Sequence, residues 1–355
     1  MSSEKPRVKI GFVGVGGMGQ AAHLRNYVLV PECEVVAIAE IRQELAKSVA
    51  ARWGVPRVYA SHEEMLEKEE LDGIVAPQPF LRHGTLVPEL LSKGVPILTE
   101  KPLAGSIEMG EKILAAMQAA KTWMMIAYHK RSDPASMAAK KEIDRLRATN
   151  ELGKINYVRT IIPRGEWTYN GFSQNLGSSE PYPQLSFDPP ASDMDKATFD
   201  AYTSFTDYYV HQINFVGYLL GEKWSPAYVA KSGRQLSGVS AGGVDCSLEM
   251  APYSSTLEWG EEAFVCFERG WVRISLPGPL AMNRAGRLEV FRDPGNGATP
   301  KKEEWQMPSV GAMWQQARNF VAALRGDRDV ACCGVPEALD DLRFTREFIR
   351  LWKGA

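Results

Sequence analysis

The sequence predicts a two-domain α/β protein, with a helix-covered parallel sheet followed by a domain that contains an antiparallel sheet. Its 355 residues exceed what one hydrophobic core usually organises. Up to residue 128, short apolar runs alternate with helical patterns, as in a parallel sheet with helices on both faces. Beyond that point, strand-like runs separated by Gly, Pro and Asn are typical of antiparallel strands. We therefore expect domains at residues 1–128 and 129–355.

The elements of the first domain follow from apolar runs and helix signals. Ser61-His62-Glu63-Glu64 is a capping box, which predicts that a helix begins after residue 61. Other helical patterns occur at 18–30, 43–53, 84–92 and 106–120. Apolar runs predict buried strands at 8–13, 34–40, 71–76, 95–99 and 123–127.

The second domain is predicted to begin with a charged amphipathic helix at 134–149 and to end with helices at 312–325 and 336–353. Between them, strand-like runs occur at 155–162, 228–231, 244–250, 263–267, 271–275 and 287–291. The stretch 163–190 has no period and is rich in Gly, Ser, Pro and aromatic residues. A loop of that length in a compact domain is usually functional.

Composition excludes several classes of protein. A formal net charge of −2 gives no overall electrostatic attraction to nucleic acid or to an anionic membrane. The sequence contains no apolar run of 18 residues, so no membrane span is predicted. The stretch Met1–Arg7 lacks an apolar signal core, so we expect a cytoplasmic protein. Five cysteines without a Cys-x-x-Cys motif predict reduced, packed thiols and no metal site.

The run Gly14-Val15-Gly16-Gly17-Met18-Gly19 follows a strand and opens a helix, the context that a dinucleotide fingerprint requires. Gly14 permits the tight turn, Gly16 allows a pyrophosphate to approach the backbone, and Gly19 allows the helix to pack on the strand. The free N–H groups of the helix N-terminus attract phosphates. The run predicts a nicotinamide dinucleotide cofactor.

Glu40 ends the second strand, 21 residues after Gly19. A carboxylate there can accept both hydroxyls of an adenosine ribose and would repel a 2′-phosphate, so NAD is expected rather than NADP. Arg42 leaves an alternative open, because its guanidinium could hold a 2′-phosphate if Glu40 turned away. Its other interpretation is a solvated residue at a helix start.

Glu100-Lys101-Pro102 follows the strand at 95–99. Strand ends in a doubly wound sheet face the ligand crevice, so Lys101 can point its ammonium at a substrate hydroxyl. Pro102 fixes φ and is a candidate for a cis peptide bond. The alternative for Lys101 is a surface lysine in a turn.

Asp207 and His211 are four residues apart in a stretch with an apolar helical side. On a helix they would share one face, within hydrogen-bonding reach of each other. A histidine has a pKa near neutrality and suits general acid–base chemistry, and an aspartate would orient its ring. A structural histidine is the alternative.

These landmarks, together with Pro77, His83 and Gly153-Lys154-Ile155, resemble the glucose–fructose oxidoreductase / inositol dehydrogenase / MocA family over nearly the whole chain. The resemblance implies a Rossmann domain followed by an α/β domain with a large, mostly antiparallel sheet. It also implies an NAD(P)-dependent oxidoreductase acting on a hydroxyl of a sugar, inositol or related polyol. In the inositol-dehydrogenase-like members, residues matching Lys101, Asp207 and His211 form the catalytic set.

The resemblance places candidate cofactor contacts at Gly14, Gly16, Gly17, Met18, Gly19, Glu40, Pro77, His83, Glu100 and Lys101. Candidate substrate contacts are Lys101, His129, Trp167 and His211. The chain departs from the family where the loop 76–83 looks about two residues longer and where Tyr202–Thr206 replaces a glycine-rich stretch. The aromatic loop with Trp167, Tyr169, Phe172, Tyr182 and Phe187 suggests a pocket for a glycoside or larger sugar, with the 3-hydroxyl of a glycosyl unit as a candidate site of oxidation.

Three functions remain open on the sequence alone. The first is an NAD-dependent dehydrogenase in which His211 or Lys101 accepts the hydroxyl proton. The second is an NAD-dependent glycosidase or lyase that oxidises the sugar transiently, eliminates a leaving group and returns the hydride. The third is a non-catalytic NAD sensor.

The strands from 244 to 275 also predict self-association. Their apolar side chains exceed what the two C-terminal helices can cover, so we expect a homodimer or homotetramer through the C-terminal sheet. These side chains are Leu248, Met250, Phe264, Phe267, Trp271 and Val272.

Overall fold

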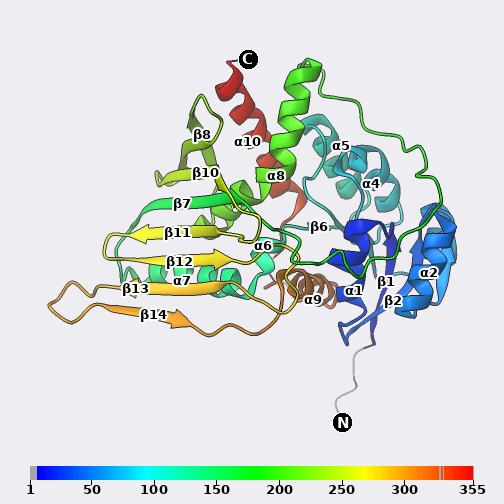
Figure 1. The fold of residues 1–355 in the computed structure, drawn as a ribbon, viewed down its shortest axis with the longest axis horizontal. Coiled ribbons are helices and arrows are strands. Elements are labelled where there is room, and N and C mark those ends of the chain that lie inside the picture. The colour runs from blue at the N-terminus through cyan, green and yellow to red at the C-terminus, as the bar shows by residue number, and fades with distance from the viewer. Residues whose placement is uncertain (1–5, 328, 331, 355) are drawn as a thin grey trace, which may run out of the picture. The chain divides into compact units, whose positions relative to one another are not determined.

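The computed structural model describes residues 6–327, 329–330 and 332–354. Its contacts divide the chain into two compact units (Figure 1). Unit 1 contains the residues up to Tyr128 together with Asn170–Asp195 and Gln316–Leu342. Unit 2 contains His129–Tyr169, Lys196–Gln315 and the residues from Arg343 onward. The predicted domains were continuous, whereas unit 1 also takes in two later segments of the chain.

Unit 1 is built on a six-stranded parallel sheet with the order β3-β2-β1-β4-β5-β6. This is the order of the doubly wound nucleotide-binding fold, so the predicted parallel α/β architecture is confirmed. The sequence analysis missed β3, which is only three residues long. The strands are β1 Val8–Val13, β2 Cys33–Ala39, β3 Arg57–Tyr59, β4 Gly73–Ala76, β5 Ile97–Thr99 and β6 Met124–Ile126.

The helices of unit 1 mostly follow the predicted pattern. Ser61 Oγ accepts a hydrogen bond from the backbone N–H of Glu64 at 3.2 Å, so the predicted cap is present. The helix after the glycine turn differs from expectation because its first part is a π-helix, a form frequently found at functional sites. The segments are η1 Gly19–Leu24, α1 Arg25–Tyr27, α2 Gln43–Trp53, α3 His62–Lys68, η2 Phe80–Arg82, α4 His83–Leu91, α5 Ile107–Ala119 and most of α9 Ala312–Leu324.

Unit 2 is built on an eight-stranded sheet with the order β14-β13-β12-β11-β7-β10-β9-β8. Only the β7–β10 pair is parallel, which confirms the large, mostly antiparallel sheet. The sequence analysis missed β9 and β14. The strands are β7 Ile155–Arg164, β8 Trp224–Val229, β9 Gln235–Ser240, β10 Asp245–Ser254, β11 Glu261–Phe267, β12 Gly270–Leu276, β13 Arg287–Arg292 and β14 Lys301–Trp305.

Two long helices of unit 2 cover one face of this sheet. Helix α7 (Pro134–Thr149) packs against β12 and β13, and α8 (Lys196–Leu220) packs against β7 and β10. The other helices are the short α6 (His129–Ser132) and the end of α10 (Val335–Lys353). Among the described residues, no helix combines the length and apolarity needed to cross a bilayer. No disulfide joins the five cysteines, which all lie in the described part of the chain.

The structure corrects our argument about uncovered apolar surface on this sheet. Four of the six side chains that we expected to be uncovered are buried, namely Leu248, Met250, Phe267 and Val272. Only Phe264 and Trp271 remain partly exposed. The expected excess of apolar surface was wrong because α7 and α8 cover one face of the sheet in addition to the C-terminal helices.

Candidate functional site

The glycine turn of unit 1 has the geometry that the fingerprint predicts. Gly14 has a backbone φ angle of +95°, which residues other than glycine rarely adopt. A Cβ on Gly19 would lie 2.8 Å from the carbonyl oxygen of Gly14, so this position also requires glycine. A Cβ on Gly16 would make only an ordinary van der Waals contact, with Nη2 of Arg42 at 3.5 Å, so the backbone here is not crowded. A pyrophosphate can therefore approach the backbone at Gly16.

Glu40 is buried beside this turn and holds two neighbours. Its carboxylate accepts hydrogen bonds from the backbone N–H of Val15 at 3.0 Å and of Arg42 at 3.1 Å. It also accepts from Nε of Arg42 at 3.0 Å, and this bond raises the pKa of the guanidinium. Arg42 is thus paired with Glu40, which corrects the interpretation of it as a solvated residue.

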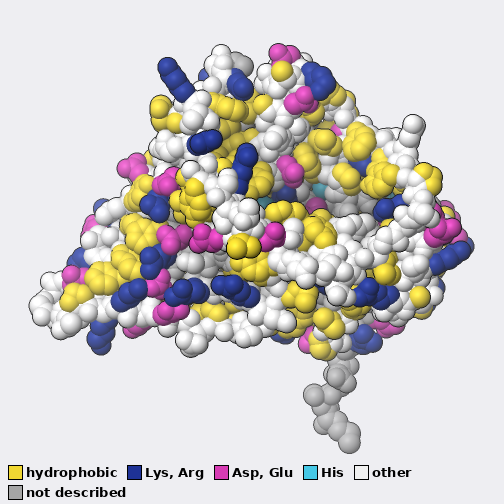
Figure 2. All heavy atoms as spheres, in the orientation of Figure 1, with side chains coloured by type: hydrophobic (Ala, Val, Ile, Leu, Met, Phe, Trp, Pro, Cys, Tyr) yellow, Lys and Arg dark blue, Asp and Glu magenta, His cyan; other side chains and the backbone are white. Residues whose placement is uncertain are grey.

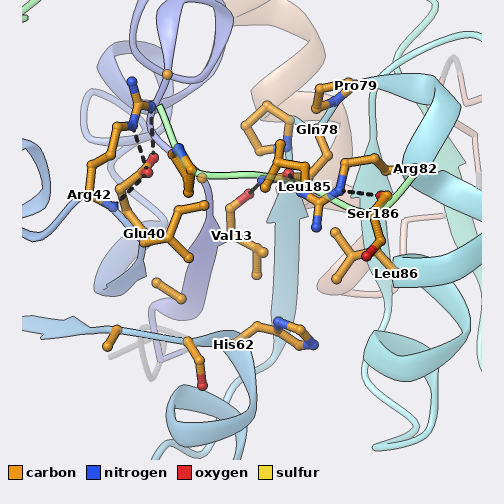
Figure 3. A pocket seen from close by; sticks show the side chains of 18 of the residues that line it. Val13, Glu40, Arg42, His62, Gln78, Pro79, Arg82, Leu86, Leu185 and Ser186 are labelled. Carbon is orange, nitrogen blue, oxygen red and sulfur yellow. Dashed lines mark hydrogen bonds and ion pairs between the residues drawn. The ribbon is translucent and has the colours of Figure 1, made fainter. Parts of the chain in front are cut away.

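A cavity of about 390 Å³ opens beside these residues, within unit 1. Figure 3 shows Glu40 and Arg42 on one side of it, Gln78 and Leu185 on the other, and His62 across from them. The ends of β1, β2 and β4 and a stretch of the 170–195 segment form its walls. The lining residues include Val13, Gly14, Gly16, Glu40, Arg42, Ser61, Pro77, Gln78, Arg82 and Tyr182–Ser186. The size and the donors fit the adenosine and phosphate end of a dinucleotide.

The loop after β4 supports the turn through residues that the sequence analysis named only in part. Pro77 packs on Gly19, and Gln78 donates a hydrogen bond to the carbonyl oxygen of Val13 at 2.7 Å. His83 is fully buried, with its ring nitrogens 3.0 Å from the carbonyl oxygen of Leu103 and 3.1 Å from that of Gln78. Burial lowers the pKa of His83, against the raising effect of the two backbone carbonyl groups. His83 holds the loop and does not line the cavity.

Glu100 and Lys101 lie just beyond the end of β5, at the carboxyl edge of the parallel sheet. Nε2 of His23 lies 2.6 Å from Oε1 of Glu100, so the π-helix is joined to this strand end. Burial tends to raise the pKa of Glu100, but the hydrogen bond from His23 and the charge of Lys101 outweigh it and hold the pKa below its ordinary value. The peptide bond between Lys101 and Pro102 is cis, as the sequence allowed. The sequence analysis missed His23.

In unit 2, the predicted pair lies on a continuous helix. Asp207 and His211 are one turn apart on α8, so they share one face of it. Asp207 is exposed and His211 is half-buried. The ring of His211 meets that of His129 edge to face, with centroids 4.6 Å apart. The structure thus brings together two of the three unit 2 residues that we predicted to contact substrate.

A buried carboxylate holds the residues next to these two histidines. Glu261 on β11 forms a salt bridge with Lys130 and accepts a hydrogen bond from Nε2 of Gln212 at 2.7 Å. Nε1 of Trp259 donates to it at 3.1 Å. Lys130 adjoins His129 and Gln212 adjoins His211, so Glu261 links the short helix α6 to α8. This network was not predicted, because no local pattern connects residues so far apart.

The aromatic residues of 163–190 are divided between the two units. Trp167 belongs to unit 2, where its carbonyl oxygen accepts a hydrogen bond from the backbone N–H of Leu280 at 3.2 Å. Phe172 and Tyr182 belong to unit 1, where Phe172 lies against Gly17 and Tyr182 lines the cavity. The structure therefore places part of this loop at the predicted cofactor site, whereas we had assigned all of it to a substrate pocket.

Comparisons with known proteins agree with this architecture. Residues 8–128 match the family described as "Oxidoreductase family, NAD-binding Rossmann fold" (GFO_IDH_MocA), which bears out NAD as the predicted cofactor. An inositol 2-dehydrogenase of Rubrobacter xylanophilus is 30% identical over 145 residues, covering 40% of this chain and 41% of that protein. A scyllo-inositol 2-dehydrogenase (NAD(+)) of Bacillus subtilis is 26% identical over 218 residues, covering 61% and 54%. The matches thus span about half or less of these relatives.

The fold similarity extends over almost the whole chain. The crystal structure of a putative NADPH-dependent oxidoreductase from Desulfitobacterium hafniense superposes with a TM-score of 0.76, covering 99% of this chain and 97% of that one. At 13% identity, this likeness concerns the fold alone. Residues 8–128 thus match the NAD-binding Rossmann domain of the Gfo/Idh/MocA oxidoreductases, and the glycine turn, Glu40 and the strand order of unit 1 agree with that match.

Proposed function

We propose that the protein is an NAD-dependent oxidoreductase that transfers hydride between nicotinamide and a secondary hydroxyl of a sugar, glycoside or polyol. The observation that carries this proposal is the NAD-binding turn of unit 1 combined with the histidine pair of unit 2. The names of the inositol dehydrogenases that resemble the chain support a polyol-like substrate.

The proposed roles follow from the chemistry of the side chains. His211 accepts the hydroxyl proton, because an imidazole is a competent base near neutral pH. Asp207, on the same face of α8, stabilises the protonated ring. Lys101 binds the substrate oxygen and stabilises the negative charge that develops on it. Bound NAD supplies the hydride acceptor, and the Gly14–Gly19 turn and Glu40 hold its phosphates and ribose.

The experiment that tests the proposal is a screen of inositols, aldoses and glycosides for reduction of NAD, followed by the absorbance of reduced nicotinamide. Net reduction with at least one polyol supports the dehydrogenase. A glycoside that is cleaved without net reduction, in a reaction that still requires NAD, would favour the glycosidase or lyase instead. Binding of NAD without turnover of any compound would favour the sensor.

We predict that Glu40→Ser shifts cofactor preference from NAD towards NADP. The substitution removes a carboxylate that repels a 2′-phosphate, and it releases Arg42, which Glu40 now binds. A hydrogen bond to a charged group is worth about 1.5–3 kcal/mol, so the ratio of the two dissociation constants should change by about 10- to 100-fold. The measurement is titration of protein fluorescence with each reduced cofactor.

Glu44→Ser provides the matched control for this variant. Its carboxylate is exposed in the first turn of α2 and does not line the cavity, so this substitution should leave the preference unchanged. Tighter binding of NADP than of NAD by the unmodified protein would contradict the assignment of Glu40.

We also propose that the protein self-associates through the face of the eight-stranded sheet that α7 and α8 leave uncovered. The rings of Phe264, Trp271 and Phe291 follow one another across this face, with centroids 5.3 and 5.8 Å apart. Arg273 pairs with Glu289 beside them. Figure 2 shows hydrophobic side chains interspersed with acidic and basic ones over these strands. Mixed aromatic and charged surfaces of this kind are common at interfaces between subunits.

Light scattering at micromolar concentration should therefore give the mass of a dimer or tetramer. Trp271→Glu should shift the protein towards monomer, because it buries a charge at the centre of the aromatic row. Tyr228→Glu is the control, since Tyr228 is 58% exposed on β8, at the edge of the sheet. A monomeric unmodified protein would rule this surface out.

A further inference from the structure

The segment Asn170–Asp195 leaves unit 2 in the sequence but packs entirely within unit 1. It has no regular secondary structure over most of its length, and it appears in Figure 1 as the green loop that passes α2 and crosses in front of β1. Its first part lies on the glycine turn, where Nδ2 of Asn175 donates to the carbonyl oxygen of Gly17 at 2.9 Å. Gln20 and the backbone of Leu176 exchange hydrogen bonds at 2.8 and 3.1 Å.

Two carboxylates attach the middle of this segment to helix N-termini. Glu180 accepts hydrogen bonds from the backbone N–H groups of Glu44 and Leu45 at 3.1 Å, at the start of α2. Asp188 accepts from the backbone N–H of Gly84 and from Oγ1 of Thr85, both at 2.8 Å, at the start of α4. A carboxylate at this position satisfies free N–H groups and interacts favourably with the helix dipole.

Neither helix has a side-chain cap of its own. Arg42 and Arg82 occupy the N-cap positions of α2 and α4, and neither side chain makes a cap hydrogen bond. Helices α3 and α5, by contrast, are capped locally by Ser61 and Ser106. The two helices that depend on the segment are those that follow β2 and β4, on either side of β1 and its glycine turn.

The stretch between the two carboxylates crosses the carboxyl edge of the sheet. Strands β2 and β4 are two positions apart, or about 10 Å. The chain from residue 180 to residue 188 can reach about 26 Å when extended, so it has length to arch over a ligand. Pro181 and Pro183 stiffen it. Its residues Tyr182 to Ser186 form one wall of the cavity, and Nε of Arg82 donates to the carbonyl oxygen of Ser186 at 3.1 Å (Figure 3).

Tyr182 offers a planar surface at the adenosine end. The guanidinium of Arg42 lies 5.0 Å from the centre of its ring, and Arg42 is bonded to Glu40, the predicted ribose ligand. The side chain of Tyr182 is 66% exposed, so most of its surface is accessible to a ligand. A planar base can stack on a tyrosine ring or on a guanidinium.

We propose that residues 180–188 form a strap that encloses the adenosine end of bound NAD, with Tyr182 and Arg42 contacting the adenine and Glu180 and Asp188 keeping the strap closed. Tyr182 is then a cofactor-binding residue, and the two carboxylates are positioning residues. Exchange of NAD and NADH requires the strap to open, so the strap slows both binding and release of the cofactor. This inference rests on NAD binding and not on the identity of the sugar.

The test is the rate of NADH exchange, measured without any sugar. Protein loaded with NADH is mixed with excess NAD, and the loss of NADH fluorescence gives the release rate. The double variant Glu180→Ala, Asp188→Ala should release NADH at least about tenfold faster, since two helix caps are lost. Association should also be faster, because an open strap admits the cofactor. Merely damaging the site would raise release without speeding association, and that result would contradict the strap.

Further variants separate the strap from general loss of stability. Tyr182→Ala should speed NADH release about three- to tenfold, without lowering the melting temperature of the cofactor-free protein, because it removes only stacking. Phe187→Ala is the matched control, since Phe187 is 56% exposed in the same stretch and does not line the cavity. Asp200→Ala controls for loss of a carboxylate, as Asp200 is an exposed residue of α8. Both controls should exchange NADH like the unmodified protein.

Amide hydrogen exchange provides an independent measurement. Binding of NADH should slow exchange in residues 181–188 of the unmodified protein, and should slow it much less in the double variant. The proposal fails if NADH leaves protection of this stretch unchanged, or if release from the unmodified protein is as fast as from the double variant. A protein that exchanges NADH slowly but reduces no NAD with any sugar would leave the strap intact and contradict only the proposed reaction.

Discussion

His211→Ala should reduce the rate of hydride transfer by about 10²- to 10⁴-fold, the usual contribution of a positioned general base. Affinity for NAD should change little, because the contacts that we propose for its phosphates and ribose lie in unit 1, at the Gly14–Gly19 turn and Glu40. The measurement is single-turnover reduction of bound NAD with the best sugar or polyol from the screen. A single-turnover measurement also detects an oxidation that is later reversed. It therefore tests the role of His211 under the glycosidase and lyase alternatives as well.

Companion variants assign the remaining roles. Asp207→Asn should slow the same step without removing substrate binding, whereas Asp200→Asn, two turns earlier on α8, should not affect it. Lys101→Ala should also depress turnover. The double change at Lys101 and His211 should cost much less than the product of the two single effects if both residues act on one hydroxyl. Near-normal hydride transfer by His211→Ala would instead make Lys101 the proton acceptor to test.

Lys130→Met should destabilise the folded protein by about 3–5 kcal/mol, because it leaves the buried carboxylate of Glu261 without its cation. Lys130 is 4% exposed and Glu261 is 3% exposed, so little water can replace the lost partner. The measurement is the free energy of unfolding of the NAD-free protein in urea. Because unfolding of a two-unit protein can have more than one step, the transition should be followed by tryptophan fluorescence, to which Trp259, a residue that contacts Glu261, contributes.

A charge-neutral pair isolates the cause of this effect. Lys130→Met combined with Glu261→Leu should recover much of the lost stability, since no unpaired charge then remains in the interior. Lys196→Met is the matched control. Lys196 pairs with Asp200 on the surface of α8, and exposed pairs contribute about 0–1 kcal/mol. Equal losses from Lys130→Met and Lys196→Met would mean that the Lys130–Glu261 pair does not support the fold.

The same network should influence catalysis if our assignment of His211 is right. Gln212 and Lys130, which both contact Glu261, adjoin His211 and His129. Loss of the Lys130–Glu261 pair should therefore loosen the edge-to-face contact between the two rings. In Lys130→Met protein that remains folded, we expect hydride transfer to fall while NAD affinity stays near that of the unmodified protein.

The sequence by itself determined the features that depend on local backbone chemistry. The positive φ of Gly14 and the close approach of its carbonyl oxygen to Gly19 both require glycine. The turn could therefore be predicted from the spacing of its glycines. Helices α2 and α7 begin and end where their apolar period and breakers place them. Strands β3, β9 and β14 escaped prediction, because short or polar strands acquire their structure from their neighbours in the sheet rather than from their own composition.

Only the tertiary structure decided which distant residues act together. Glu180 caps α2 through Glu44, 136 residues earlier in the chain, and Asp188 caps α4 through Gly84, 104 residues earlier. The missing side-chain caps at Arg42 and Arg82 are a local sign that the partners of α2 and α4 come from elsewhere in the chain. Likewise, the packing of helices on the sheet of unit 2 decides that Glu261 pairs with Lys130 and that Leu248 is buried. A sequence pattern reports the conformation of its own segment, whereas these contacts form only when the whole unit is folded.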